Sequence, residues 1–186
     1  MRVIVGYEFS QIVTMAFRKK GHEAYSCDLL PTEGNPQWHF QEDILKVLES
    51  EKFDLGIFHP PCTHLAVFGA RWFAEKRADG RQQEGIDFFM RLVEAPIEKI
   101  AIENPIGIMS TIYRRPDQIL QPFWFGDPYQ KATCLWLKGL PKLQPTNIVE
   151  GKEQKCWKEP PSPDRWKNRS RTYKEIAEAM ATQWSC

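Results

Sequence analysis

Short apolar runs alternate along the chain with segments in which apolar residues recur every three or four positions. The runs are short, and three of them (2–5, 53–59 and 99–102) are rich in Val, Ile or Phe, which is typical of strands buried in a sheet. They cover residues 2–5, 22–27, 53–59, 99–102 and 132–137. The helical period covers residues 10–20, 41–50, 81–94 and 172–184. This alternation predicts an α/β fold with a doubly wound, mostly parallel sheet.

The first predicted helix carries residues that start and stop a helix. Ser10 is the expected N-cap, and Gly21 is the expected stop. We expect Ile12, Met15 and Ala16 to share the inward face of this helix.

Three segments show no regular period. Residues 31–36 are rich in proline, glycine and asparagine and indicate a loop, and residues 63–80 form a polar and aromatic stretch. Residues 141–171 combine several prolines with many charges, so we expect irregular structure there. The helix that follows should turn Ile176 and Met180, with Ala179, toward the core.

Composition narrows the class of protein. A chain of 186 residues predicts one domain, residues 1–186, and 42% hydrophobic residues are enough to form a core. The net charge of +1 excludes a strongly basic nucleic-acid-binding chain, although not a local basic face. No apolar run is long enough to cross a membrane, so the expectation is a soluble, cytoplasmic protein. Five scattered cysteines argue against a disulfide framework and against a metal site, so we expect no metal.

Polar or reactive residues follow four of the predicted strands. In an open α/β sheet, ligands bind outside the carboxyl ends of the strands, so these positions are the candidate site. The residues are Tyr7, Glu8, Phe9 and Ser10 after the first strand, Asp28 after the second, Pro60, Pro61 and Cys62 after the third, and Glu103, Asn104 and Pro105 after the fourth.

Each of these residues also has a plain structural interpretation. Cys62, held by two prolines, could be a nucleophile or a small buried apolar residue. Glu103 could act on a substrate or cap a helix, and Asp28 could accept ribose hydroxyls or form a turn. The usual Gly-x-Gly-x-x-Gly motif is absent, which favours a nucleoside ligand without a diphosphate.

The sequence around Cys62 and Glu103 resembles the Pro-Cys and Glu-Asn motifs of the C5-cytosine-specific DNA methyltransferase family. Further segments follow the order of that family's motifs. They are Glu8-Phe9 with residues 16–22, the acid Asp28, the pair Asp43-Ile44, Phe125-Gly126 with Pro128, Gln130 and Lys131, and residues 170–173 before the last helix.

The resemblance has departures. Ser10-Gln11 stands where the family has a glycine pair, and Ala132 and Cys134 replace two arginines. Residues 140–170 leave no room for the family's target-recognition domain, so residues 141–171 stand in its place. The chain therefore resembles a compact, phage-type member, which implies a cytoplasmic location in a bacterium or a phage-infected host.

The resemblance implies a Rossmann-like fold that binds S-adenosylmethionine (SAM) and methylates C5 of cytosine, in DNA or in another cytosine-containing nucleotide. Cys62 would attack C6 of the base, and Glu103 would contact its N3 and amine. The implied cofactor contacts are Tyr7, Glu8, Phe9, Ser10, Asp28, Asp43 and Pro60. The implied substrate contacts are Pro61, Asn104, Pro105, Gln130 and Lys131.

Three alternatives remain open from the sequence. The chain could be a non-catalytic relative that binds SAM or nucleic acid, a methyltransferase of RNA or free nucleotides, or an unrelated α/β enzyme such as a cysteine hydrolase. Trp157 and Trp166 could stack on a base or belong to the core. Candidate phosphate contacts are Arg71, Arg77, Arg81, Arg114, Arg115, Lys167, Arg169 and Arg171.

Overall fold

The computed structural model describes residues 1–151, 153 and 159–185. Within them, a seven-stranded sheet has the order β3-β2-β1-β4-β5-β7-β6. The strands are β1 (Arg2–Gly6), β2 (Glu23–Cys27), β3 (His39–Phe40), β4 (Leu55–Phe58), β5 (Lys99–Pro105), β6 (Gln118–Leu120) and β7 (Thr133–Lys138). The first five strands across the sheet are parallel, and β7 runs antiparallel to both of its neighbours. The predicted doubly wound α/β fold is confirmed, and it is Rossmann-like.

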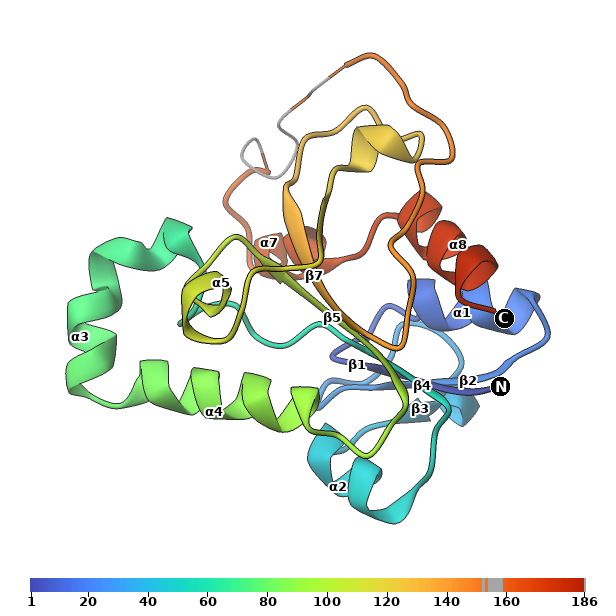
Figure 1. Ribbon diagram of the computed structural model, residues 1–186, viewed down its shortest axis with the longest axis horizontal. Helices are drawn as coiled ribbons and strands as arrows, with labels where there is room; N and C mark the ends of the chain where they lie inside the picture. The colour runs from blue at the N-terminus through green and yellow to red at the C-terminus, as the bar shows by residue number, and fades with distance from the viewer. Residues whose placement is uncertain (152, 154–158, 186) are drawn as a thin grey trace.

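Helices cover both faces of the sheet (Figure 1). On one face lie α1 (Ile12–Lys19) and α8 (Lys174–Gln183), and on the other lie α2 (Ile44–Ser50) and α4 (Arg81–Val93). The remaining helices are α3 (Phe73–Ala78), α5 (Met109–Ile112), α7 (Arg165–Ser170) and the 3₁₀ turns η1 (Pro36–Trp38), η2 (Val67–Trp72) and η3 (Pro122–Trp124). None of the helices described here has the length and apolar character needed to cross a bilayer.

Alternation along the strands divides the core into two apolar clusters. Val3 and Val5 of β1 belong to the cluster under α1 and α8, whereas Ile4 belongs to the cluster under α2 and α4. Gly6 ends β1 without a side chain because a Cβ atom there would lie 2.8 Å from the Phe58 ring. This close approach brings the ends of β1 and β4 together.

The predicted first helix needs two corrections. Its N-cap is Gln11, in the left-handed region at φ 57°, and not Ser10. Its buried face carries Val13, Thr14, Ala16 and Phe17, while Ile12 and Met15 are only half-buried. The stop at Gly21 is confirmed, since this residue has φ +84° directly after the helix. In α8, Ile176, Ala179 and Met180 are buried as predicted.

Several elements differ from the sequence prediction. The strand expected to end at Ile102 continues through Glu103-Asn104-Pro105, because these residues pair with β7. The polar stretch 63–80 contains η2 and α3, and residues 141–171 contain α7, so the latter segment is not wholly irregular. The strands β3 and β6 and helix α5 were also not predicted.

Candidate functional site

Strand register aligns one residue from each of four neighbouring strands at a single edge of the sheet. Gly6 pairs with both Cys27 and Phe58, and Phe58 pairs with Ile102. The next residues along the chain are therefore Tyr7, Asp28, His59 and Glu103, in the spatial order Asp28, Tyr7, His59, Glu103. The strand order reverses between β1 and β4, which is where open α/β sheets bind ligands.

Glu103 lies in a network of polar groups at this edge. Its Oε2 is 2.8 Å from Nδ1 of His59, and the side chain is 18% exposed. Burial raises the pKa of Glu103, but the hydrogen bond with His59 and the charges of His59 and Lys131, with a further hydrogen bond from Thr133, together hold it below its ordinary value. Glu103 is therefore a carboxylate at neutral pH.

The loop that carries Cys62 is fixed at both ends. The Cys62 carbonyl accepts hydrogen bonds from the N–H groups of Leu65 (3.0 Å) and Ala66 (2.9 Å), and Nδ2 of buried Asn104 donates to the Pro60 carbonyl (2.9 Å). Beyond the turn, a Cβ atom at Gly107 would lie 2.3 Å from the Leu65 carbonyl oxygen, so only glycine fits. This packing holds the Cys62 backbone in one conformation, which suits a group that must be positioned for attack.

Cys62 and Glu103 are close enough for their charges to interact. Burial, and then the Glu103 carboxylate, raise the pKa of the Cys62 thiol, while Lys131 and Arg169 act in the opposite direction. In the free protein Cys62 is therefore a thiol at neutral pH. Forming the thiolate requires added positive charge, or loss of the Glu103 charge, when a substrate binds.

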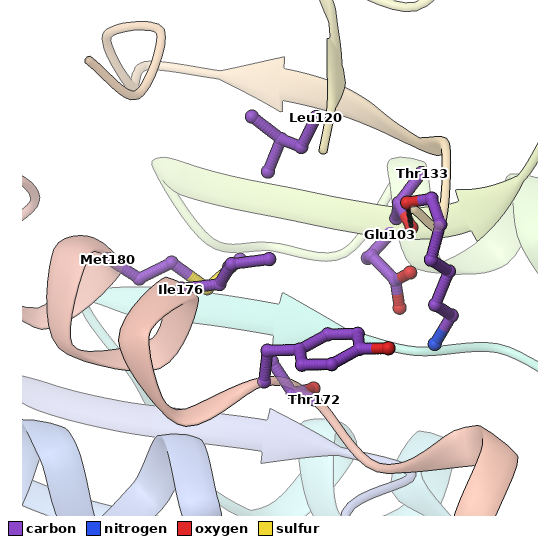
Figure 2. Close-up of a pocket in the computed structure, with 8 residues that line it drawn as sticks. Glu103, Leu120, Thr133, Thr172, Ile176 and Met180 are labelled. Carbon is purple, nitrogen blue, oxygen red and sulfur yellow. Dashed lines mark hydrogen bonds between the residues drawn. The ribbon is translucent and has the colours of Figure 1, made fainter. Parts of the chain in front are cut away.

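A small recess opens beside Glu103 (Figure 2). Leu120, Ile176 and Met180 form its apolar end, and Glu103 and Thr133 stand at the polar end. Lys131, Thr172 and Tyr173 complete the lining. The recess joins β5 and β7 to the start of α8, so it combines an apolar wall with a carboxylate and a cation.

The residues after β1 are turned inward. Both carboxylate oxygens of Glu8 accept hydrogen bonds from the first turn of α1, from the N–H groups of Val13 (2.5 Å) and Thr14 (3.1 Å) and from the Thr14 hydroxyl (2.6 Å). Glu8 therefore caps α1, and Ser10 lies beside the same turn, with its Oγ 3.5 Å from the Ile12 nitrogen. Glu8 and Ser10, which the sequence predicted to contact the cofactor, therefore lie against the first turn of α1.

Tyr7 and Phe9 lie on either side of Glu8 in the chain. Tyr7 adopts φ 63°, and its ring packs edge-on against Phe88, with centroids 5.4 Å apart. Phe9 is 6% exposed because the segment that includes α7 covers it, with Arg171 over the ring at 5.3 Å and Trp166 at 6.2 Å. The Phe9 ring is thus covered by the segment expected to replace a recognition domain.

The two aspartates of the candidate cofactor site also make local contacts. Asp28 is half-buried, its Oδ1 accepts a hydrogen bond from the Leu30 N–H (3.0 Å), and loss of hydration raises its pKa. Asp43 caps α2 by accepting from the Leu45 N–H (2.9 Å). The Leu29 backbone also hydrogen-bonds to the Asp28 carboxylate, whose charge acts on Tyr7, and this carboxylate suits the hydroxyls of a nucleoside ribose.

Of the predicted substrate contacts, some lie near Glu103 and Cys62 and others lie on the surface or within a strand. Lys131 lies near Glu103 and Cys62, and its Nζ donates to the Arg169 carbonyl (3.1 Å). Pro61 is exposed, Pro105 lies in β5, and Gln130 is exposed, with its N–H donating to the Glu153 carbonyl (2.9 Å). Buried Asn104 acts on the backbone of Pro60, as described above.

The candidate phosphate contacts divide into paired and unpaired groups. Ion pairs join Arg81 to Glu75 and Asp79, Arg114 to Asp117, Lys167 to Asp164, and Arg171 to Glu33. Arg71, Arg77 and Arg115 are exposed on the surface. Trp166 is 53% exposed on α7, whereas Trp157 lies outside the described residues.

One residue near the reactive groups, His59, was not assigned from the sequence, and another, Arg169, was assigned only as a candidate phosphate contact. His59 follows β4 directly, so its place at a strand end was a usable signal, but its partner is visible only from the register of β4 and β5. Arg169 lies on α7, and its guanidinium is 5.8 Å from the centroid of the Phe68 ring, in the turn that follows the Cys62 loop. No cluster of metal-ligating side chains occurs among the residues described.

No protein-family model and no curated protein sequence matches the chain. Among solved structures, it is similar to a prophage-encoded protein of E. coli to which a DNA modification methyltransferase activity has been attributed. The TM-score is 0.51 at 17% sequence identity, and the alignment covers 87% of this chain and 55% of that one. The chain thus spans little more than half the length of that protein, and what the two share is the Rossmann-like fold.

Proposed function

We propose that the protein is a SAM-dependent methyltransferase that modifies C5 of cytosine, with DNA as the substrate. The observation that carries this proposal is that Cys62 and Glu103, which follow or end neighbouring strands, lie close enough for their charges to interact beside the switch point of a Rossmann-like sheet. The attribution of DNA modification methyltransferase activity to the prophage protein of similar fold supports methyl transfer to DNA.

Cys62 is the proposed nucleophile. Its thiolate forms a bond to C6 of cytosine, and the electron pair of the C5–C6 double bond then makes C5 nucleophilic. After methylation, loss of the C5 proton restores the double bond and expels the thiolate. The fixed Cys62 backbone meets the positional demand of the first step.

Glu103 is the proposed group that contacts N3 and the exocyclic amine. Charge develops on N3 as the thiolate adds, and a carboxyl group fixed at that position stabilises the adduct. Lys131 and Arg169 both favour the Cys62 thiolate. They therefore supply the positive charge that the family's two arginines, replaced here by Ala132 and Cys134, would bring.

The proposed cofactor site lies at the ends of β1 and β2. SAM supplies an electrophilic methyl group when it is bound there. Asp28 would accept the ribose hydroxyls, and Tyr7, Phe9, Ser10, Asp43 and Pro60 would surround the remainder, while Glu8 acts indirectly by holding α1. A target base within duplex DNA must leave the helix to reach Cys62, and without a recognition domain we expect low sequence specificity.

The test is transfer of labelled methyl from SAM to DNA, RNA and free cytidine nucleotides in parallel. We expect transfer to DNA at C5, and a loss of at least about 10⁴-fold in Cys62→Ser with SAM affinity retained. Cys27→Ser is the matched control, because a serine hydroxyl can keep the hydrogen bond that Cys27 makes to the Glu42 carbonyl.

Each other outcome revises the proposal. Transfer only to RNA or to free nucleotides would replace DNA as the substrate. Absence of transfer to all three, with SAM still bound, would favour a non-catalytic binding protein. Full activity in Cys62→Ser would remove the covalent mechanism.

A further inference from the structure

The His59 ring lies between two carboxylates at the switch point. Its Nδ1 is 2.8 Å from Oε2 of Glu103, and its backbone N–H donates to the Gly6 carbonyl (3.0 Å). The His59 charge also acts on Glu8, on the opposite side, where it lowers the pKa of that carboxyl against the effect of burial. The ring thus joins the ends of β1, β4 and β5.

The second ring nitrogen of His59 is buried. The side chain is 9% exposed, and Nε2 has no hydrogen-bond partner among the residues described. Leaving such an atom without a partner costs folding free energy, so its retention needs a reason. A leucine or phenylalanine would fill the space without that cost, but neither could hold Glu103.

We propose that His59 is the positioning residue of Glu103 and the store of the proton that Glu103 passes to N3 of the base. This inference rests on the proposed function. As the Cys62 thiolate bonds to C6, an electron pair moves to N3. The imidazolium form of His59 passes its Nδ1 proton to the Glu103 carboxylate and becomes neutral, and Glu103 passes a proton to N3 and is a carboxylate again.

The reverse transfer completes the cycle. When the C5 proton has left and the thiolate is expelled, N3 gives its proton back through Glu103 to His59, so no proton is gained or lost at the pair. The groups that face this exchange are Glu8 after β1, Glu103 on β5, and Lys131 and Cys62 beyond Glu103. Glu103 is held as a carboxylate in the free protein, which is why it needs a neighbouring proton donor.

The first experiment measures the pH profile of methyl transfer for wild type and His59→Gln. A glutamine amide can donate a hydrogen bond to Glu103 but cannot store a proton. We expect kcat to fall about 100-fold with KM for DNA retained, and the pH profile of kcat to differ in shape from that of wild type. His64→Gln is the matched control, because His64 also has a buried nitrogen with no described partner but shows no contact with Glu103.

The second experiment is a double-mutant cycle with histidine NMR. If His59 acts through Glu103, the losses of His59→Gln and Glu103→Gln will not add, and Glu103→Gln will shift the His59 ring resonances in the free protein. Wild-type kcat and pH profile in His59→Gln, or additive losses, would overturn the inference. Absence of methyl transfer in wild type would instead overturn the proposed function and the proton role with it, while the NMR result still decides whether the pair exists.

Discussion

Glu8 and Glu103 are two largely buried carboxylates at strand ends on either side of β4, yet their surroundings are opposite in kind. The oxygens of Glu8 accept hydrogen bonds from two backbone N–H groups and one hydroxyl of α1, groups that do not titrate in this range. The oxygens of Glu103 contact the imidazole of His59 and lie near the ammonium group of Lys131 and the thiol of Cys62. Burial raises the pKa of Glu8, whereas His59 and Lys131 keep that of Glu103 low.

The difference shows how one residue type can be held by fixed donors at one strand end and by titratable partners at another. Glu8 receives fixed donors, so it holds a helix in place and has nothing to exchange with a ligand. Glu103 receives partners whose charge can change, so its own protonation can change during a reaction. Position at a strand end marks a candidate residue, and the partners decide its role.

The largest expected effect separates the two carboxylates by activity. Glu103→Gln should lower methyl transfer by about 10²–10³-fold, because the amide cannot donate a proton to N3 or carry the charge. Glu8→Gln should lower kcat far less, since its partners belong to α1. Steady-state kinetics would compare kcat of the two variants. A larger loss of kcat for Glu8→Gln would contradict the assignment of the catalytic role to Glu103.

The next effect concerns the cofactor side of the site. Asp28→Ala should weaken SAM binding by about tenfold or more, because a carboxylate that accepts ribose hydroxyls is removed. Calorimetry measures this affinity directly, and Asp87→Ala, on the surface of α4, serves as control. Unchanged SAM affinity in Asp28→Ala would mean that the ribose lies elsewhere.

The third expected effect is a loss of stability when Glu8 is replaced. Glu8→Gln should lower the free energy of unfolding by about 1–2 kcal/mol, because the amide nitrogen of glutamine cannot accept the hydrogen bonds that one of the two Glu8 oxygens accepts from α1. Urea denaturation of wild type and variant measures this difference. Retained stability would show that Glu8 is not the cap that fixes α1.

The pH dependence of stability should have opposite signs at the two sites. The folded-state pKa of Glu103 is lowered, so its contribution is present above the unfolded pKa and is lost as pH falls through the folded one. The folded-state pKa of Glu8 is raised, so its ionisation costs stability as pH rises from the unfolded value to the folded one. Unfolding of wild type, Glu8→Gln and Glu103→Gln across the acid range would measure both slopes, and slopes of the same sign would refute the contrast.

The smallest effect is expected where α7 meets the loop after β2. Arg171 forms an ion pair with Glu33, with both side chains at least one-third exposed, so Arg171→Ala should cost no more than about 1 kcal/mol. Thermal unfolding at low and high salt would measure it. A loss well above that value would mean that the Arg171 contact with Phe9 carries the stability.

Periodicity along the chain was enough to predict five of the seven described strands and the helices α1, α2, α4 and α8. The N-cap was wrong because Glu8, which lies before Ser10 in the chain, reaches the first turn of α1 instead. The extension of the β5 strand, which includes Glu103, depends on pairing with β7, about thirty residues away, and no local pattern reports that pairing. The His59–Glu103 pair likewise follows from register between strands and not from either segment alone.

The most direct test of the account is covalent trapping at Cys62. The full chain would be incubated with SAM and a pool of DNA of mixed sequence in which cytosines are replaced by 5-fluorocytosine, whose C5 fluorine cannot leave as a cation. The account predicts a denaturant-stable adduct that carries the transferred methyl group, maps to Cys62 by mass spectrometry, and is absent in Cys62→Ser. Turnover of ordinary DNA without any adduct at Cys62, or an adduct at Cys27 or Cys134, would contradict it.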